Sequence, residues 1–326
     1  LHGNFSRVLD KLKQCVQAKC YFHIKNNGVK KGEPDNETKV ITWTVDVNYN
    51  QLSLEDAEFI DKIAENQTLV DGSVQVFKTT IGEKGGVTVG DDVTAPSRIT
   101  TANNEIKIHL GKIDQSYRVV FKTVDKDGIY NSNEKYENTA QFIPRKGETH
   151  HLKAHVTLPH QGEFLGKKGV HNKEDWTIDW EIVVNKSKSK LESIVVTDDL
   201  GDESVQVLLE DKIKVTKEGS NEPLVAGEDY EITVNGNQFE LKIPGETSDT
   251  YIVQYSSYIL AQETTNITNN AEVKSNEEVV GTTTKEASVQ VKISSGGGPT
   301  EGGTGGLFLK KWKTGQTNRW KALLLY

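Results

Sequence analysis

The sequence predicts an all-β protein made of two β-sandwich domains in tandem, and three observations support this prediction. Apolar and polar residues alternate through many short segments, which is the period of a strand with one buried face. Turn-forming pairs such as Asn235-Gly236 and Asp127-Gly128 separate these segments. The pattern also recurs once along the chain, which indicates two copies of one domain.

The two clearest strands each contain a tryptophan. Residues 41–47 read Ile-Thr-Trp-Thr-Val-Asp-Val, and residues 178–184 read Ile-Asp-Trp-Glu-Ile-Val-Val. Helical spacing is confined to residues 5–19, so the body is expected to contain strands alone. Many short strands with turn signals are typical of sandwich folds. The further expected strands lie at residues 74–77, 105–110, 117–124, 230–234, 239–243, 251–255 and 288–293.

The repeat is found by aligning Trp43 with Trp180, which are 137 positions apart. At this offset Lys30-Lys31-Gly32 falls on Lys167-Lys168-Gly169, and Asp61 falls on Asp198. Asn138-Thr-Ala answers Asn269-Asn-Ala at an offset of 131. The text of residues 72–76 also resembles that of residues 203–207, at a shifted offset. These matches predict two copies of a domain of about 120–140 residues.

Five segments follow from the repeat and the composition. The two expected sandwich domains are residues 21–144 and residues 145–293. A glycine-rich stretch at residues 294–306 is expected to be a flexible linker. Residues 1–20 form an atypical N-terminal segment with helical spacing, and residues 307–326 are expected to be the truncated start of a further repeat.

Charge and cysteine content exclude several classes of protein. The whole chain carries −8, residues 1–31 carry +6 and residues 304–326 carry +5, so residues 32–303 carry −19. So acidic a body argues against a nucleic-acid partner, since phosphates would be repelled. No apolar run approaches the roughly 20 residues of a membrane span, so membrane insertion is not expected. The two cysteines, Cys15 and Cys20, cannot form a disulfide framework for the body.

Polar residues recur at core-facing positions of both copies. Asp61, Asp198, Asn138 and Asn269 each alternate in phase with the apolar residues around them, so their side chains are expected on the buried faces of strands. Lys167 has the parity of Leu165, whereas the glycines on both sides of Lys30 leave its face open. Because burying an unpaired charge is very costly, some interaction must neutralise these groups.

An intramolecular isopeptide bond between lysine and asparagine is one way to neutralise them. Burial lowers the pKa of a lysine and raises that of an aspartate, which leaves a nucleophilic amine beside a protonated acid. The acid can then polarise the asparagine amide and move protons as ammonia leaves. We expect Lys30–Asn138 and Lys167–Asn269 bonds, assisted by Asp61 and Asp198, that join the first strand of each domain to the last. Buried ion pairs or solvent-facing side chains are the alternatives.

No cofactor and no metal site is expected, and the only chemistry expected is this self-limited bond formation, so the chain is not predicted to be an enzyme. His150, His151, His155 and His160 lack the ligand spacing of a zinc site. Residues 125–134 resemble a calcium loop faintly but lack the spacing of an EF-hand, so they are interpreted as a turn.

The motifs resemble those of a known family. Lys30-Lys-Gly, the Trp43 strand ending in Asn48, Phe59-Ile-Asp61 and Asn138-Thr-Ala140, with their second copies, are similar to the immunoglobulin-like domains of Gram-positive collagen adhesins of the MSCRAMM type. The resemblance implies immunoglobulin-like β-sandwich domains with Lys–Asn bonds assisted by Asp. The doubled lysines leave Lys31 and Lys168 as alternative donors. Residues 307–326 are similar to the opening of a B-type stalk repeat of these adhesins.

The resemblance also implies a function. It predicts a monomeric, secreted surface protein that is anchored to the cell wall in a longer chain and contributes to cell adhesion and virulence. The implied partner is a host matrix protein of the collagen or fibrinogen class. Two alternatives remain open: a structural spacer that projects another binding head, and accessory domains of a secreted enzyme.

Overall fold

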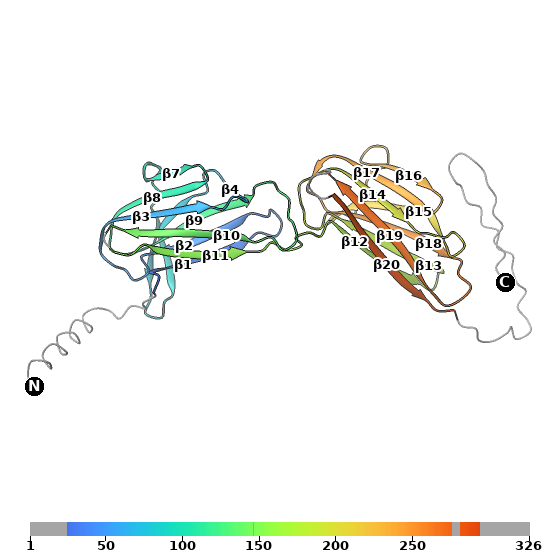
Figure 1. The fold of residues 1–326 in the computed structure, drawn as a ribbon, viewed down its shortest axis with the longest axis horizontal. Helices are drawn as coiled ribbons and strands as arrows, with labels where there is room; N and C mark the ends of the chain where they lie inside the picture. The colour runs from blue at the N-terminus through green and yellow to red at the C-terminus, as the bar shows by residue number, and fades with distance from the viewer. Residues whose placement is uncertain (1–24, 146, 276–280, 294–326) are drawn as a thin grey trace, which may run out of the picture. The chain divides into compact units, whose positions relative to one another are not determined.

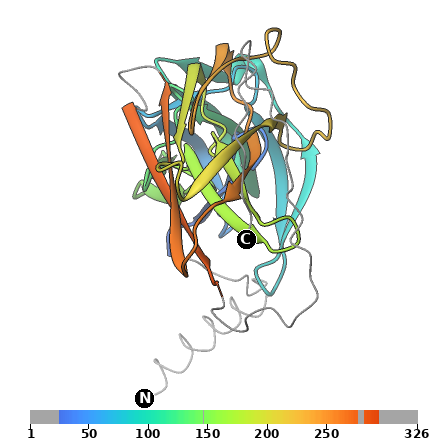
Figure 2. The same ribbon diagram turned by 90° about the vertical axis from the view of Figure 1, so that its right-hand side faces the viewer.

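The computed structural model describes residues 25–145, 147–275 and 281–293, and these residues form strands, turns and one short 3-10 helix, Pro96–Arg98. The chain divides into two compact units, residues 1–162 and 163–326. Each unit is a sandwich of two antiparallel sheets, whose strands can be followed in Figures 1 and 2. The predicted fold class, tandem immunoglobulin-like β-sandwiches, is confirmed.

In the first unit, one sheet has the order β1-β2-β9-β5-β6, with β4 beside β9. The opposite sheet has the order β11-β10-β3-β8-β7. The strands are β1 Gly28–Pro34, β2 Ile41–Val47, β3 Leu54–Ile63, β4 Gln67–Leu69, β5 Gln75–Ile81, β6 Val87–Asp92, β7 Ile99–Ala102, β8 Glu105–Ile113, β9 Ser116–Asp125, β10 Tyr136–Pro144 and β11 His150–Val156.

The second unit repeats this plan with sheets of order β12-β13-β18-β15 and β16-β17-β14-β19-β20. Its long strand β15 takes the place of both β4 and β5. The strands are β12 Leu165–Asn172, β13 Thr177–Val184, β14 Leu191–Asp199, β15 Gln206–Lys217, β16 Glu231–Asn235, β17 Gln238–Thr247, β18 Tyr251–Ile259, β19 Thr265–Ser275 and β20 Gly281–Val291.

The two tryptophans occupy equivalent core positions, as the repeat predicts. Trp43 of β2 lies opposite Phe121 of β9, and Trp180 of β13 lies opposite Tyr255 of β18. Both indole rings are completely or almost completely buried between the sheets. The alternation read from residues 41–47 and 178–184 therefore places the large apolar side chains in the core.

One sequence match between the two copies does not correspond to equivalent positions in the structure. Residues 72–76 resemble residues 203–207, which would align Gln75 with Gln206, but Gln75 is exposed on β5 whereas Gln206 is buried. The structural counterpart of Gln206 is Gln67 of β4. Gln67 accepts a hydrogen bond from Thr123, and Gln206 accepts one from Ser257; each of these hydroxyls also accepts from the indole N–H of the tryptophan in its unit. The short strand β4 and the loop after it disguise this correspondence in the sequence.

The structure differs from the expected domain boundary at 144/145. Strand β11 follows that boundary but pairs along its length with β10 of the first unit, and the two units divide between Gly162 and Glu163. The strand reads His-His-Leu-Lys-Ala-His-Val, so its buried face is marked mainly by Leu152 and Val156. This weak apolar signal explains why sequence periodicity does not reveal the strand.

Strands β11 and β20 also change one expectation about the bond-forming residues. Asn138 lies on β10 and Asn269 on β19, so each asparagine is on the penultimate strand of its unit and not on the last.

The segments expected at residues 1–20, with Cys15 and Cys20, and at residues 294–306 and 307–326 lie outside the described residues. Among the residues that are described, no helix is long and apolar enough to cross a membrane.

Candidate functional site

The first candidate site is a lysine–aspartate pair that bridges the two sheets of the first unit. Lys30 on β1 projects from one sheet, and Asp61 on β3 projects from the other. The Lys30 Nζ lies 2.6 Å from Asp61 Oδ2, and both side chains are fully buried. The alternation of β3 brings Asp61 into the core between Phe59 and Ile63. The pair therefore sits inside the apolar core.

Asn138 reaches the same buried region from the neighbouring strand β10. Asp61 lies opposite Ala140 in the β3–β10 register, and Asn138 is two residues from Ala140 on the same face. Its side chain is buried, yet within the described residues neither Asn138 Nδ2 nor Oδ1 has a hydrogen-bond partner. The structure thus places the three predicted residues of the first copy in one cluster.

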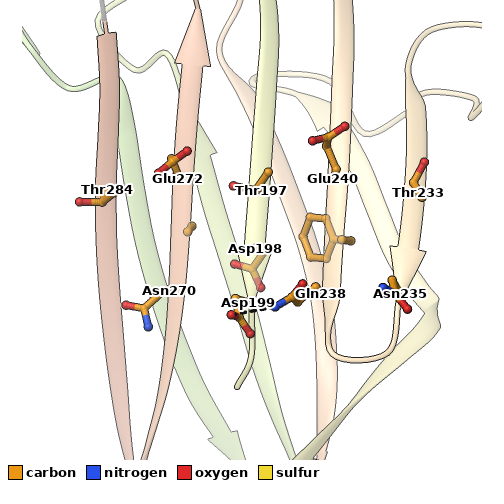
Figure 3. Close-up of a pocket in the computed structure, with 12 residues that line it drawn as sticks. Thr197, Asp198, Asp199, Thr233, Asn235, Gln238, Glu240, Asn270, Glu272 and Thr284 are labelled. Atoms are coloured by element: carbon orange, nitrogen blue, oxygen red, sulfur yellow. Dashed lines mark hydrogen bonds between the residues drawn. The ribbon is translucent and has the colours of Figure 1, made fainter. Parts of the chain in front are cut away.

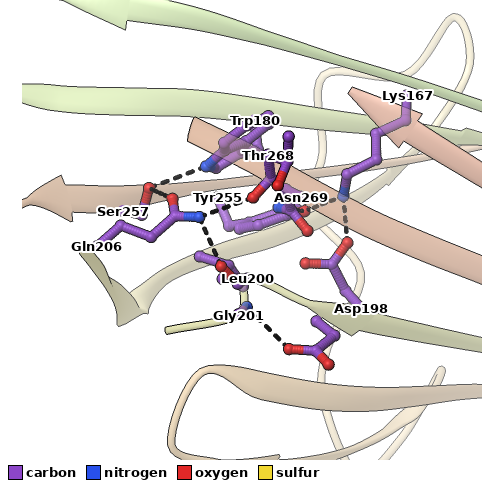
Figure 4. A network of polar contacts seen from close by, with 11 residues as sticks. Lys167, Trp180, Asp198, Leu200, Gly201, Gln206, Tyr255, Ser257, Thr268 and Asn269 are labelled. Carbon is purple, nitrogen blue, oxygen red and sulfur yellow. Dashed lines mark hydrogen bonds and ion pairs between the residues drawn. The ribbon is translucent and has the colours of Figure 1, made fainter. Parts of the chain in front are cut away.

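The second unit contains the same cluster with one addition, shown in Figure 4. Lys167 on β12 donates a short hydrogen bond to Asp198 on β14, and both side chains are fully buried. Tyr255 on β18 places its hydroxyl oxygen 2.7 Å from Lys167 Nζ and 3.0 Å from Asn269 Nδ2. Asn269 is completely buried on β19. Tyr255 is therefore a fourth member that the sequence analysis did not identify.

Burial shifts the pKa values of both pairs toward the neutral forms. Desolvation lowers the pKa of Lys30 and Lys167 below the usual lysine value, although the facing carboxylates oppose this shift. Desolvation likewise raises the pKa of Asp61 and Asp198, against the opposing charge of the lysines. Each site therefore favours a neutral amine and a protonated acid more than solvent would.

Aromatic rings enclose each amine. Lys30 Nζ lies 5.4 Å from the centroid of the Trp43 ring and 4.9 Å from that of Phe121. Lys167 Nζ lies 5.6 Å from the Trp180 ring and 5.5 Å from the Tyr255 ring. The ring faces exclude water and attract whatever positive charge the amine retains.

The glycine two residues after each lysine makes room for the tryptophan. A Cβ at Gly32 would lie 2.6 Å from Cζ3 of Trp43, and a Cβ at Gly169 would lie 2.5 Å from Cε3 of Trp180. Such distances are shorter than any ordinary carbon–carbon contact. The Lys-x-Gly motif therefore lets the indole pack closely against the strand that carries the lysine.

The alternative donors lie outside both clusters. Lys31 is exposed, since it points to the opposite face of β1 from Lys30. Lys168 is also exposed, and its Nζ lies 2.8 Å from Glu181 Oε1 on the solvent side of the sheet. Neither side chain is brought to the aspartate or asparagine of its unit.

Several buried polar atoms of the two clusters lack hydrogen bonds. Among the described residues, Asp61 Oδ1, Asp198 Oδ1 and Asn269 Oδ1 have no partner, in addition to both polar atoms of Asn138. Buried polar atoms are almost always hydrogen-bonded in folded proteins. Five such atoms lie in these two equivalent clusters, so unsatisfied polar groups are concentrated where the lysine, aspartate and asparagine meet.

The sequence analysis also did not identify a chain of buried, hydrogen-bonded side chains beside each cluster. Trp43 Nε1 donates to Thr123 Oγ1 at 2.8 Å, and Thr123 Oγ1 donates to Gln67 Oε1 at 2.8 Å. In the second unit the chain runs from Trp180 through Ser257 to Gln206, at 2.9 and 2.7 Å. A hydroxyl at a core-facing position of the strand opposite each tryptophan is the signal that could have revealed it.

The calcium-like segment is a hydrogen-bonded turn. Asp125 Oδ1 accepts backbone N–H groups from residues 127, 128 and 129, and Asp125 Oδ2 accepts the hydroxyl of Tyr136. The carboxylate is therefore already occupied. Within the described ranges, no cluster of histidine, cysteine or acidic residues could hold a metal ion, and this includes His150, His151, His155 and His160.

A shallow groove crosses the outer face of the second unit, over the sheet β16-β17-β14-β19-β20. Figure 3 shows Thr197 between Glu240 and Glu272, which lie opposite it on the two neighbouring strands. Asp199 lies between Gln238 and Asn270 in the next row. The groove is thus lined by hydroxyl, amide and carboxylate groups.

Solved structures similar to the chain include surface adhesins. The collagen adhesin of S. aureus is 14% identical, with 77% of this chain and 86% of that chain covered and a TM-score of 0.34. The collagen-binding subdomain of the Enterococcus faecalis surface protein ACE is 22% identical over 40% of this chain and 97% of its own, with a TM-score of 0.33. A longer structure of the Enterococcus faecalis MSCRAMM ACE is 16% identical over 78% and 89%, with a TM-score of 0.35.

The sequence itself identifies the family. No match is found among curated proteins. The family profile described as "Collagen binding domain" matches residues 25–151 and residues 162–283. The two matches together cover more than half of the chain, and each contains one complete lysine, aspartate and asparagine cluster. The chain belongs to the collagen binding domain family, of which it carries two tandem copies.

Proposed function

We propose that this chain is a segment of an extracellular, cell-wall-anchored adhesin whose two domains are each locked by an intramolecular Lys–Asn isopeptide bond. Membership of the collagen binding domain family supports a role in adhesion. The single observation that carries the proposal of bonds is the pair of equivalent buried clusters. In each cluster a desolvated amine meets a carboxyl group beside a buried asparagine.

The reaction uses only groups already present in each cluster. The neutral amine of Lys30 attacks Cγ of Asn138, so a new N–C bond forms while the Cγ–Nδ2 bond breaks. Asp61, protonated at the start, hydrogen-bonds the amide oxygen and polarises the carbonyl. Asp61 then passes a proton from the attacking nitrogen to the departing nitrogen, which leaves as ammonia. Asp198 performs the same function for Lys167 and Asn269.

Each bond would close a large loop and tie the two sheets together. The first joins residues that are 108 positions apart, and the second joins residues 102 apart. Cross-links of that span stabilise by about 4–5 kcal/mol in the disulfide chain-entropy relation. Since β1 and β10 lie in opposite sheets, a pulling force could not separate the sheets without breaking a covalent bond. Such resistance suits a surface protein under shear.

Intact-mass spectrometry tests the bonds. Loss of one ammonia lowers the mass by about 17 Da, so two bonds lower it by about 34 Da relative to the sequence. Peptides that join the Lys30 region to the Asn138 region, and the Lys167 region to the Asn269 region, should appear after digestion. The Asp61→Ala/Asp198→Ala variant should have the unreduced mass, and Asp199→Ala, which changes an exposed neighbour, should keep both bonds. An unreduced mass in the parent chain would overturn this part of the proposal.

We further propose that the partner is a host matrix protein of the collagen or fibrinogen class. The family description supports collagen, and the groove over β14, β17 and β19 offers one row of hydroxyls and carboxylates to a polar rod-like ligand. Binding of the chain to immobilised collagen and to immobilised fibrinogen, measured separately, should show which of the two proteins is the ligand. Glu240→Lys/Glu272→Lys should weaken binding through the groove, whereas Glu58→Lys on the first unit should not. Bond formation without binding to either protein would instead support a structural spacer.

A further inference from the structure

Tyr255 and Phe121 are structural equivalents that differ by one hydroxyl group. Each lies directly opposite the tryptophan of its unit, Tyr255 opposite Trp180 and Phe121 opposite Trp43. Each ring also borders the buried lysine amine, at 5.5 Å and 4.9 Å from ring centroid to Nζ. The two clusters therefore share a backbone frame, and the phenol oxygen is present in only one of them.

The phenol oxygen gathers the two nitrogens that would react. It accepts hydrogen bonds from Lys167 Nζ at 2.7 Å and from Asn269 Nδ2 at 3.0 Å. These two bonds use both lone pairs of the oxygen. Burial and the nearby Asp198 raise the pKa of Tyr255 well above the usual tyrosine value, so the phenol stays neutral. The attacking nitrogen and the departing nitrogen therefore both donate hydrogen bonds to the Tyr255 hydroxyl oxygen.

The hydroxyl also orients the amide, because the phenol oxygen accepts from both Lys167 Nζ and Asn269 Nδ2. With Asn269 Nδ2 on Tyr255, Asn269 Oδ1 is left buried without a partner among the described residues, as is Asp198 Oδ1. A proton on Asp198 can therefore serve the amide oxygen. In the first unit Phe121 cannot accept a hydrogen bond, and within the described chain both amide atoms of Asn138 lack partners. Among its described residues, the first unit therefore has no counterpart of the contact between Tyr255 and Asn269.

We propose that Tyr255 is a positioning residue that orients the Asn269 amide toward Lys167, so that the second domain forms its isopeptide bond faster than the first. This inference rests on the proposed bonds. The step itself is unchanged: the Lys167 Nζ–Asn269 Cγ bond forms, the Cγ–Nδ2 bond breaks, and Asp198 moves the proton that converts Nδ2 into ammonia. Tyr255 exchanges no atom and receives the departing ammonia as a hydrogen-bond acceptor.

The test follows bond formation during refolding of the full chain. Chain recovered unfolded from inclusion bodies, with its unreduced mass checked, is diluted into buffer and quenched with acid at intervals. Digestion and mass spectrometry then give the linked fraction of each domain separately, while tryptophan fluorescence gives the folding rate. Loss of one orienting hydrogen bond corresponds to about a 10-fold change in rate. We therefore expect Tyr255→Phe to slow the second bond about 10-fold while the folding rate stays the same.

The matched gain variant keeps the proposal testable even if Tyr255→Phe disturbs folding. Phe121→Tyr gives the first unit the missing hydroxyl and should accelerate the Lys30–Asn138 bond while the second bond is unaffected. Equal linking rates in the parent chain, or no change in either rate with both variants, would overturn the role of Tyr255 and leave the bonds intact. Absence of linking in both domains at every time would instead overturn the proposed function.

Discussion

The two units place the same three polar residues on the same strands and surround them differently. Lys30 is covered by an indole and a phenyl ring, whereas Lys167 is covered by an indole and a phenol. The difference leaves Asn138 without the hydrogen bond that Asn269 makes. The same strand order therefore assembles both clusters, and the phenol oxygen is the difference between their amide contacts.

A second difference lies on the outer face of the same strands, where Asp46 is nevertheless buried. Asp46 lies opposite Arg118 in the first unit, and their side chains form a bidentate pair at 2.8 and 2.9 Å. At the equivalent positions the second unit has Val183 opposite Ile252. The register of β2 with β9 matches that of β13 with β18 even though the pair changes from ionic to apolar. The outer face therefore carries different residue types in the two units at one register.

The largest expected effect comes from removing the assisting acid of one unit at a time. Asp61→Ala should abolish the bond of the first unit, lower its free energy of unfolding by about 4–5 kcal/mol, and leave the second unit unchanged. Asp198→Ala should do the reverse. Differential scanning calorimetry, with each transition assigned by proteolysis, measures both effects.

The exposed neighbour provides the control for this experiment. Asp199→Ala removes a surface carboxylate next to Asp198 and should leave both transitions in place. Equal shifts of both transitions in either single variant would mean that the two units do not unfold independently. Unchanged transitions in Asp61→Ala and Asp198→Ala would show that the aspartates serve no bond.

The sequence was sufficient to predict the buried faces of the clusters because strand parity is a local property. Asp61 and Asp198 each follow an apolar-x-apolar run, and the structure places both on the core side. The repeat then added information that one copy could not give, since two equivalent polar positions in a core are improbable by chance. The same reasoning did not predict which face of the strand carries Lys30, because its neighbours Gly28 and Gly32 have no apolar side chains that mark the buried face.

Tyr255 and strand β11 could not be predicted in this way. A tyrosine within an apolar run is typical of any sandwich core, and its role depends on two partners that are 88 and 14 positions away in sequence. Strand β11 carries three histidines and one lysine, so its pairing with β10 comes from tertiary structure and not from its own periodicity. Both features depend on contacts between distant segments.

A smaller effect is expected from filling the space above the tryptophans. Gly32→Ala and Gly169→Ala place a methyl group against an indole carbon at 2.6 and 2.5 Å, so the strand or the ring must move. Overpacking of this kind costs about 1–3 kcal/mol. Each substitution should destabilise only its own unit and slow its bond, as measured by urea unfolding and linked fraction. Gly86→Ala, where a methyl group would meet no neighbour and the backbone is not left-handed, controls for glycine removal in general.

A still smaller effect is expected from exchanging the outer pair. Asp46→Val combined with Arg118→Ile copies the second unit and should change the stability of the first unit by less than about 1 kcal/mol, because a buried ion pair and an apolar pair are often equivalent. Asp46→Val alone should cost about 1–3 kcal/mol, since it leaves the Arg118 guanidinium without its acceptor. Urea unfolding of the first unit measures both. A double variant as unstable as the single one would indicate that the ion pair has a role of its own.

The smallest expected effect is an alkaline change in stability that distinguishes unlinked from linked lysines. In Asn138→Ala/Asn269→Ala the acceptors are absent, so Lys30 and Lys167 remain free amines. Burial lowers the pKa of both amines in the folded chain, so the folded chain releases these protons at a lower pH than the unfolded chain does. Between the two pKa values the unfolded state binds more protons, and stability therefore rises with pH toward the ordinary lysine pKa of about 10.4.

In the parent chain each of these nitrogens is an amide in both the folded and the unfolded state, so it contributes no such rise in stability. The urea midpoint of the variant, measured relative to the parent, should therefore increase as the pH rises toward the ordinary lysine pKa. Tyrosine titration is common to both proteins and cancels in this difference. Asn270→Ala, an exposed neighbour of Asn269, should follow the parent, and parallel curves for the variant and the parent would contradict the assignment of Lys30 and Lys167 as the bond-forming amines.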